Sequence, residues 1–245
     1  MMGRVFVVEV RDELRAIVRE PASLFFAIGM PVGFFVLFNL IFGAQYSQGM
    51  SAGTAMVATF GSYGVITVAA LQPGIGVAAD RDIGWLRAKR VRAVPIAVTL
   101  AAKVSAALTY AFGVLTLMGV AAGLFGTLHA SVLDLLRLAV VLMLGTLPFT
   151  LLSLAVGFRF RTGATTALLN AVLLPAAVLS GLWIPLAYLP GFVTRIARFL
   201  PTYHLSQLGL AQLYGGAALI HVFALLVTTV IAAGLAAVSY RHARP

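Results

Sequence analysis

Few side chains in this sequence could carry out covalent chemistry, and the acids among them lie outside the apolar stretches or at their edges. General acid–base or nucleophilic catalysis needs carboxylates, or serine and histidine, at a spacing that one element can bring together. No fixed helical spacing does so for Glu9, Asp12, Glu13, Glu20, Asp80, Asp82, Asp134, His129, His204, His221 and His242. The sequence also contains no cysteine, which excludes disulfides and thiolate metal sites. We therefore expect no catalytic site, metal or cofactor in this chain.

The composition indicates an integral membrane protein. Of the 245 residues, 61% are hydrophobic and 10% are charged, whereas soluble domains are roughly 45–50% apolar. The net charge of +10 does not point to nucleic acid, because membrane proteins retain lysine and arginine in their cytoplasmic segments. We expect a bacterial plasma-membrane protein that contacts lipids and not nucleic acid.

Six apolar stretches each reach the roughly 20 residues that a membrane-spanning helix needs. They are Ala22–Gly43, Thr54–Ala79, Ile96–Gly126, Leu135–Phe158, Thr165–Ile184 and Gly215–Tyr240. The sequence therefore predicts an all-α membrane protein with six transmembrane helices, in which residues 1–21 precede a transmembrane domain over residues 22–245.

Basic residues gather on one side of these predicted spans. They occur before the first span, in the loop after the second, after the fourth and after the sixth. The other side holds only Arg137, Arg195 and Arg198. By the positive-inside rule, both termini are predicted to be cytoplasmic. Lys103 lies inside the third span, near its cytoplasmic end.

The charged residues also limit the energy sources that such a protein could use for transport. ATP hydrolysis needs a phosphate-binding loop of the G-x-x-x-x-G-K-[ST] kind, and the sequence has no Gly-Lys pair. Ion-coupled transporters usually keep carboxylates or histidines within their spans, whereas the acids here lie outside the spans or at their edges. Any energy for transport would have to come from elsewhere.

The first 21 residues are predicted to form an amphipathic helix along the inner membrane surface. Phe6, Val7, Val10, Leu14 and Ile17 recur at helical spacing, and charged residues occupy the opposite side. Such a helix could be a surface anchor alone, or it could also touch a cytoplasmic partner. The pattern leaves both possibilities open.

The loop Asp80–Pro95 mixes charges of both signs with Ile83, Trp85 and Leu86, which is unlike a flexible linker rich in glycine and serine. A short helix with one apolar side could dock into a groove on a soluble protein. It could equally be an interfacial helix that Trp85 anchors in the membrane surface.

Some residues within the spans are candidates for a path or for helix packing. An amphipathic substrate could pass along hydroxyl and amide groups, although such groups often bond to a neighbouring helix. The polar set is Asn39, Gln45, Thr59, Ser62, Tyr63, Thr67, Gln72, Thr166 and Asn170, of which Asn39, Thr59, Tyr63, Thr67 and Asn170 are selected as path residues. Two G-x-x-x-G spacings, Gly29–Gly33 and Gly119–Gly123, would let helices approach closely.

The order of these features resembles the membrane subunits of ABC type-2 exporters over nearly the whole chain. Two places carry the resemblance most specifically. The loop after the second span is similar to the family pattern in Asp80, Asp82, Gly84, Trp85, Leu86, Pro95 and Lys103. The segment after the fifth span is similar to it in Ser180, Gly181, Pro185, Pro190 and Pro201. Ala102 departs from the glycine that commonly precedes this lysine, and the acids are aspartates where glutamate is usual.

The resemblance implies a permease subunit of an ATP-driven exporter that moves a drug, an antibiotic or a lipid-like molecule. A separate ATPase in two copies would bind ATP and Mg²⁺ and would contact Asp80, Asp82, Gly84, Trp85 and Leu86. Two copies of this chain, or this chain and a related permease, would form the path. Residues 186–200 would form a re-entrant helical hairpin, and Ser180, Gly181, Pro185, Pro190 and Pro201 would belong to an external gate.

One alternative remains from the residues alone. A non-transporting membrane scaffold or accessory protein would also lack charges within its spans. An ATPase encoded beside this chain that co-purifies with it would discriminate between the two.

Overall fold

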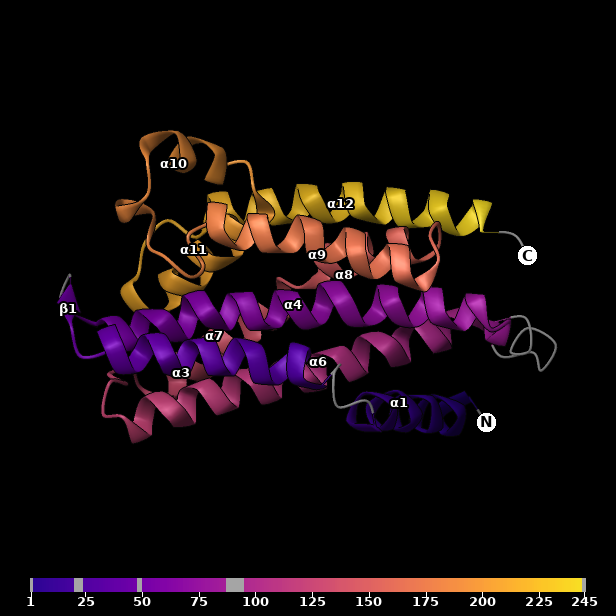
Figure 1. The fold of residues 1–245 in the computed structure, drawn as a ribbon, viewed down its shortest axis with the longest axis horizontal. Helices are drawn as coiled ribbons and strands as arrows, with labels where there is room; N and C mark the ends of the chain where they lie inside the picture. The colour runs from indigo at the N-terminus through magenta and orange to yellow at the C-terminus, as the bar shows by residue number, and fades with distance from the viewer. Residues whose placement is uncertain (1, 20–23, 48–49, 87–94, 244–245) are drawn as a thin grey trace.

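The computed structural model describes residues 2–19, 24–47, 50–86 and 95–243 (Figure 1). Its elements are α1 (Met2–Arg19), η1 (Phe25–Gly29), α3 (Met30–Phe42), β1 (Tyr46–Ser47), β2 (Met50–Ser51), α4 (Ala52–Asp82), α6 (Ile96–Leu124), α7 (Val132–Leu144), α8 (Leu147–Gly157), α9 (Thr162–Leu179), η2 (Leu186–Tyr188), α10 (Gly191–Ala197), α11 (Pro201–Tyr214) and α12 (Leu219–His242). The prediction of a helical protein is confirmed, and the strands found in the described ranges are only the short antiparallel pair β1 and β2.

Among the described residues, five helical segments are long and apolar enough to cross a membrane. They are α4, α6, the consecutive pair α7 and α8, α9 and α12. The first predicted span, Ala22–Gly43, corresponds to η1 and α3, and Ala22 itself lies outside the described residues. The apolar helix there covers Ala27–Phe42, about 24 Å at 1.5 Å per residue, which is less than the roughly 30 Å of a hydrocarbon core. A sixth crossing therefore stays a prediction.

Prolines mark irregular places within these helices. Pro31 lies in the first turn of α3 and has no N–H to donate, and the π-helical turn Phe25–Gly29 directly precedes it. Pro73 lies inside α4. The N–H of the next residue, Gly74, donates to Ser153 Oγ on α8 at 2.8 Å. The place where Pro73 interrupts the backbone hydrogen bonds of α4 is therefore hydrogen-bonded directly to α8.

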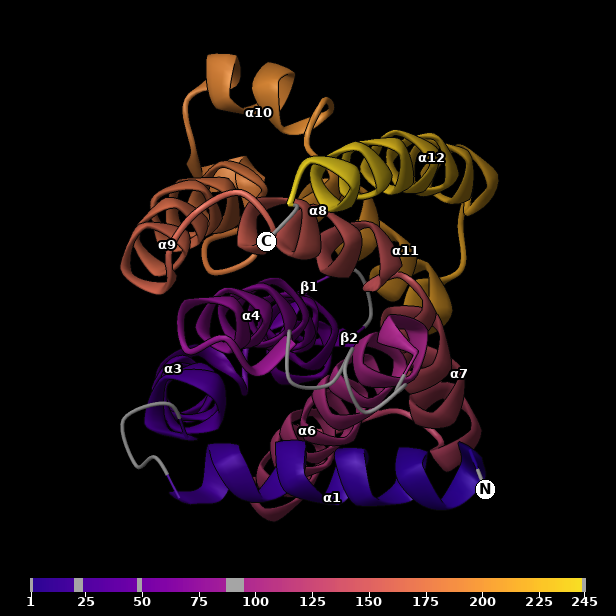
Figure 2. The same ribbon diagram turned by 90° about the vertical axis from the view of Figure 1, so that its right-hand side faces the viewer.

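Helix α4 forms the centre of the bundle. The most apolar part of α4 is 78% buried, against 17% for α9 and 11% for α12. Figure 2 shows α3 and α6 on one side of α4 and α8 and α9 on the other, and α4 contacts all four as well as α11. The outer helices α9 and α12 leave apolar faces uncovered, as expected for helices that meet lipid or another subunit.

The bundle has two different ends. At one end α1 lies crosswise to the bundle, on the opposite side from α12, and α4 and α12 both end at this end of the molecule (Figures 1 and 2); we call this the α1 end. At the opposite end, the α10 end, lie β1, η2, α10 and α11 (Figure 1). The hairpin predicted over residues 186–200 corresponds to η2 and α10. Helix α11, which packs on α4, α7 and α12, was not recognised in the sequence. Whether α1 is interfacial and the hairpin re-entrant stays a prediction.

Helices α4 and α8 cross with their backbones in contact. A Cβ atom on Gly157 would lie 2.2 Å from the carbonyl oxygen of Gly74, and one on Gly74 would lie 2.4 Å from that of Ser153. By contrast, a Cβ atom on Gly33 or Gly119 would meet nothing within 4 Å among the described residues. Glycine does permit close packing here, but not through the G-x-x-x-G spacings that the sequence suggested.

The substitution Gly74→Ala should therefore destabilise the protein. Its methyl group would push α8 away, and we expect a loss of about 1–3 kcal/mol, as in other overpacked cores, seen as a lower thermal unfolding midpoint in detergent. Gly119→Ala is the matched control and should leave the midpoint unchanged or slightly higher, because alanine favours helix. Equal midpoints for the two variants would contradict the close crossing of α4 and α8.

Candidate functional site

Lys103, in the second turn of α6, is buried at the α1 end, and its side chain is only 4% exposed. Its Nζ donates to Glu13 Oε1 of α1 at 2.7 Å. It also lies 3.0 Å from Asp80 Oδ2 at the end of α4, as an ion pair without hydrogen-bond geometry. A buried ammonium is strongly unfavourable unless opposite charges lie beside it. We call these three residues the Lys103 cluster, and it joins α1, α4 and α6 at one point.

Two further contacts hold the same three helices together. A Cβ atom on Gly76 of α4 would lie 2.9 Å from Lys103 Nζ, so the absence of a side chain at Gly76 leaves room for the ammonium group. On α6, the hydroxyl of Tyr110 donates to the carbonyl oxygen of Leu14 in α1. The position of α1 across the bundle is therefore set by polar contacts as well as by its apolar side.

The two residues after Asp80 bind the turn between α8 and α9. Arg81 Nη1 donates to the carbonyl oxygen of Gly157 at 2.8 Å and lies 3.4 Å from that of Phe160. Asp82 Oδ2 accepts from the N–H and the Oγ1 of Thr162 at 2.9 and 2.7 Å. Arg81 thus satisfies carbonyl groups where α8 ends, and Asp82 satisfies an N–H where α9 begins.

Three consecutive side chains therefore connect the end of α4 to four other helices. Asp80 reaches α6, and through Lys103 it reaches α1, while Arg81 and Asp82 reach α8 and α9. We call Asp80, Arg81 and Asp82 the α4 hub. Because each contact goes to a different element, movement at this end of α4 would act on all four neighbours.

The residues that follow the hub differ sharply in exposure. Gly84 has a positive φ of 72° and its N–H donates to the carbonyl oxygen of Arg81 at 3.0 Å, so it ends the helix. Ile83 is 77% exposed and Trp85 is 42% exposed. Leu86 is buried in a cluster with apolar side chains of α4 and α8. The part of the predicted loop over residues 87–94 lies outside the described residues.

This geometry separates the five residues that were predicted to contact an ATPase. Asp80, Asp82 and Leu86 make contacts within the subunit. Asp82 is also exposed, and contact of these three residues with an ATPase stays a prediction. Gly84 shapes the turn. Trp85 is exposed together with Ile83, which was not selected from the sequence.

Two of the residues predicted to line a path are hydrogen-bonded to the backbone of their own helices. Thr67 Oγ1 donates to the carbonyl oxygen of Tyr63, and Asn170 Nδ2 donates to that of Thr166, each one turn back on its own helix. Thr59 is only half-buried. Their polar groups therefore satisfy local backbone first, and a path role for them stays a prediction.

The ring of Tyr63 belongs to an aromatic cluster instead. It meets Trp183 edge to face, with the ring centroids 5.0 Å apart, and Phe34 of α3 lies 5.5 Å from Trp183. Trp183 Nε1 is buried and makes no hydrogen bond within the described residues. The cluster brings together α3, α4 and the segment after α9.

Asn39 takes part in a buried polar network at the α10 end. Thr127 Oγ1 donates to Asn39 Oδ1 at 3.0 Å, and Thr54 Oγ1 donates to the carbonyl oxygen of Thr127 at 3.0 Å. Ser51 Oγ bonds to the same carbonyl. This network joins α3, the start of α4 and the loop after α6, which indicates a structural role for Asn39.

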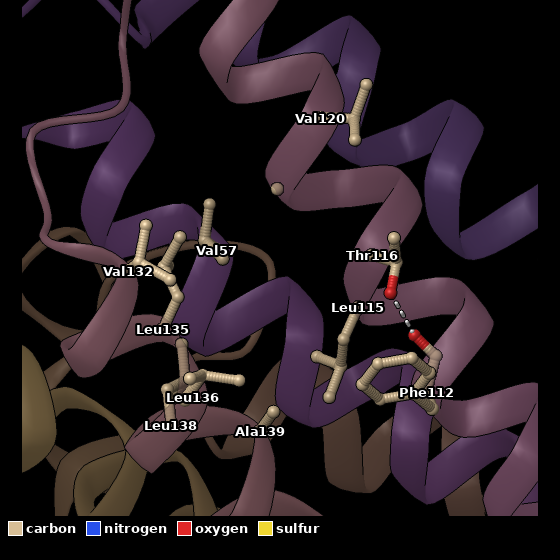
Figure 3. A pocket seen from close by; sticks show the side chains of 11 residues that line it. Val57, Phe112, Leu115, Thr116, Val120, Val132, Leu135, Leu136, Leu138 and Ala139 are labelled. Atoms are coloured by element: carbon tan, nitrogen blue, oxygen red, sulfur yellow. Dashed lines mark hydrogen bonds between the residues drawn. The ribbon is translucent and has the colours of Figure 1, made fainter.

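A pocket of about 340 Å³ lies between α6, α7 and α4. Figure 3 shows its apolar lining, which includes Val57, Leu115 and Leu138. Its one hydroxyl, that of Thr116, donates to the carbonyl oxygen of Phe112 at 2.9 Å. None of the predicted path residues lines this pocket, which offers a surface for hydrocarbon and no free hydrogen-bonding group.

The residues predicted for an external gate lie at the turns of the α10 end. Ser180, at the end of α9, is hydrogen-bonded to Thr202 of α11. Gly181 has a φ of 72°, and a Cβ atom there would lie 2.8 Å from Leu186 Cγ. The three prolines stand where helical turns begin: Pro185 before η2, Pro190 before α10 and Pro201 as the first residue of α11. These residues shape the connections, and gating by them stays a prediction.

Sequence reasoning missed two members of the site. Arg81 was counted only as one basic residue of a loop, and Glu13 only as part of the charged leader. A lysine inside a span requires an acidic partner, which could have pointed to Glu13. Three successive charged residues at the end of an apolar stretch could likewise have pointed to a junction between helices.

Replacing Lys103 with methionine should strongly destabilise the α1 end. Glu13 and Asp80 would then be left near each other without a cation, and breaking such a buried pair costs about 3–5 kcal/mol. We expect a lower unfolding midpoint and faster tryptic cleavage within α1. The triple variant Lys103→Met, Glu13→Gln, Asp80→Asn removes all three charges and should recover most of the loss. If the unfolding midpoint of the triple variant were no higher than that of Lys103→Met, the cluster would not stabilise the protein through charge.

Comparison with known proteins agrees with this architecture. Residues 4–214, most of the chain, match the family model of the ABC-2 type transporter. The chain is also 18% identical, over 195 residues, to a protein of Bacillus subtilis (strain 168) named "Putative transport permease YvfS", and the match covers 80% of each chain. The family match extends from α1 to the end of α11 and so includes the Lys103 cluster, the α4 hub and the turns of the α10 end. The chain therefore belongs to the ABC-2 type transporter family of membrane permeases.

Proposed function

We propose that this permease is the membrane subunit of an ATP-driven exporter and that a separate ATPase binds at Ile83 and Trp85. The observation that carries the proposal is the exposure of these two apolar side chains directly after the α4 hub. Exposed aromatic and aliphatic anchors of this kind commonly dominate the binding energy of protein interfaces. A partner that pulls or pushes here would act on the end of the most buried helix.

The α4 hub supports transmission of such a movement. Asp80 pairs with Lys103 of α6, which in turn pairs with Glu13 of α1, while Arg81 and Asp82 are hydrogen-bonded to α8 and α9, so these helices would move with the end of α4. The chain carries no phosphate-binding loop, and ATP with Mg²⁺ would bind to the partner. Two ATPase copies would serve two copies of the permease, whose α1 ends face the cytoplasm in keeping with the positive-inside rule.

The proposed substrate is an amphipathic molecule such as a drug, an antibiotic or a lipid-like compound. The exposed faces of α3 and α9 and the aromatic cluster of Phe34, Tyr63 and Trp183 would border its path, where apolar rings and scattered hydroxyl groups suit such a molecule. The turns around Pro185, Pro190 and Pro201 would close the path from outside. The family match favours this permease function over the alternative of a non-transporting scaffold.

The double variant Ile83→Ala/Trp85→Ala should weaken binding of the ATPase without unfolding the permease. Loss of an interface anchor costs about 2 kcal/mol, roughly thirtyfold in affinity. Co-purification, ATPase stimulation and export should all fall, while the unfolding midpoint falls less than that of the Leu86→Ala variant. Leu86→Ala is the matched comparison: its side chain is buried within the subunit, so it should lower the midpoint. Normal ATPase binding by the double variant would place the docking surface elsewhere.

Introduced cysteines should reveal the proposed pairing of two copies. The chain has no cysteine of its own, and Leu37 of α3 and Val172 of α9 are 50% and 62% exposed. We expect Leu37→Cys and Val172→Cys, combined in one chain, to crosslink between copies in membranes. Leu235→Cys on α12, which is similarly exposed, should not crosslink. Crosslinking of α12 alone would mean that the copies meet through another face.

A further inference from the structure

Helix α10 has one buried and one exposed face. Val193 and Ala197 are 6% and 0% exposed and pack toward the bundle. Phe192 and Ile196 are 58% and 42% exposed and lie one helical turn apart on α10. Phe199, in the turn directly after α10, is 86% exposed, and we include it in the outer face of α10. A large exposed apolar face with this regular spacing indicates a surface that is covered by something in the native setting.

The same face carries positive charge, and within the described residues neither of its two arginines forms an ion pair. Arg195 and Arg198 are exposed, and the carbonyl oxygen of Arg198 is held by His204 Nε2 at 2.9 Å. The sequence contains no aspartate or glutamate after Asp134. An anionic partner would therefore meet two arginines without competition from a neighbouring carboxylate.

The place of α10 in the molecule narrows the choice of partner. Figure 1 shows α10 near the ends of α9 and α12, at the end of the molecule opposite α1, and Figure 2 shows it on the outer side of both helices. Helices α9 and α12 are long and apolar enough to cross a membrane. A segment just past the ends of such helices lies at the level where a bilayer changes from acyl chains to headgroups.

We propose that the outer face of α10 binds the headgroup region of the bilayer leaflet at the α10 end and selects anionic phospholipids. Phe192, Ile196 and Phe199 insert among the upper acyl chains, and Arg195 and Arg198 bind lipid phosphates. Aromatic side chains with nearby arginines are favoured at this depth. A second copy of the chain fits the surface less well, because a two-fold contact would bring the arginines of both copies together.

The proposal can be tested with a fluorophore on Phe199→Cys in the otherwise cysteine-free protein, reconstituted in phosphatidylcholine nanodiscs. The quenchers are phosphatidylglycerol and phosphatidylcholine that carry the same nitroxide on the fifth acyl carbon, at equal mole fraction, and aqueous iodide. We expect the lipid quenchers to quench the fluorophore more strongly than iodide does. Each arginine near anionic lipid should raise local enrichment roughly fivefold, so phosphatidylglycerol should quench several-fold better than phosphatidylcholine.

Charge variants then identify the residues responsible. Arg195→Gln/Arg198→Gln should abolish the preference for phosphatidylglycerol while the label stays close to lipid. Arg137→Gln is the matched control, because Arg137 is an exposed arginine on α7, and it should leave the preference intact. Stronger quenching by iodide than by lipid would overturn the proposal, since the face would then be in water. Protection from both quenchers would also overturn it, because a protein would then cover the face.

Discussion

A charged ammonium group within an apolar bundle must have opposite charges beside it, and Lys103 imposes this requirement on the whole α1 end. Its partners come from α1 and from the end of α4, so the lysine on α6 can be accommodated only if all three helices occupy their observed places. Hydrophobic packing alone would let α1 slide across the end of the bundle, because apolar contact has little directional preference. The ion pairs of Lys103 and the hydrogen bond that the Tyr110 hydroxyl donates to α1 fix the position of this helix.

Asp80 belongs to this cluster and also begins the α4 hub. Arg81 and Asp82 extend the same junction to the turn between α8 and α9, and close backbone contact between Gly74 and Gly157 continues it into the bundle. The most buried helix is thereby linked to its neighbours by polar contacts at one end and by packing along its length. Movement delivered beside the hub would reach the whole bundle as a shift of helices rather than as a local deformation.

The α10 end is organised by different interactions. Three prolines and the left-handed Gly181 set the direction of the chain between α9 and α11, and the contact of Ser180 with Thr202 closes this connection. Within the described residues, α10 makes only sparse contacts with the bundle, and its outer face is exposed. Segments with few buried contacts open at low free energy, which suits both a gate and a surface that adapts to lipid.

The sequence by itself determined those features that depend on one segment at a time. Continuous apolar runs predicted five of the helices that could span a membrane, the prolines after Leu179 predicted a broken connection there, and the absence of a Gly-Lys pair showed that this chain has no phosphate-binding loop of its own. The order of charged and apolar segments, together with two short motifs, also sufficed to suggest the family. Each of these signals is local, because hydropathy, missing N–H groups and short motifs can be read without knowing what lies beside them.

Only the tertiary structure decided which residues meet. Glu13, Asp80 and Lys103 are far apart in sequence, and nothing in the periodicity of one helix states which acid faces a given lysine. The same reason explains why Gly74, and not the G-x-x-x-G glycines, lies at a helix crossing. It also explains why Leu86 is buried while Trp85 beside it is exposed. Burial of a particular side chain depends on neighbours supplied by other helices, and these are fixed only when the helices pack together.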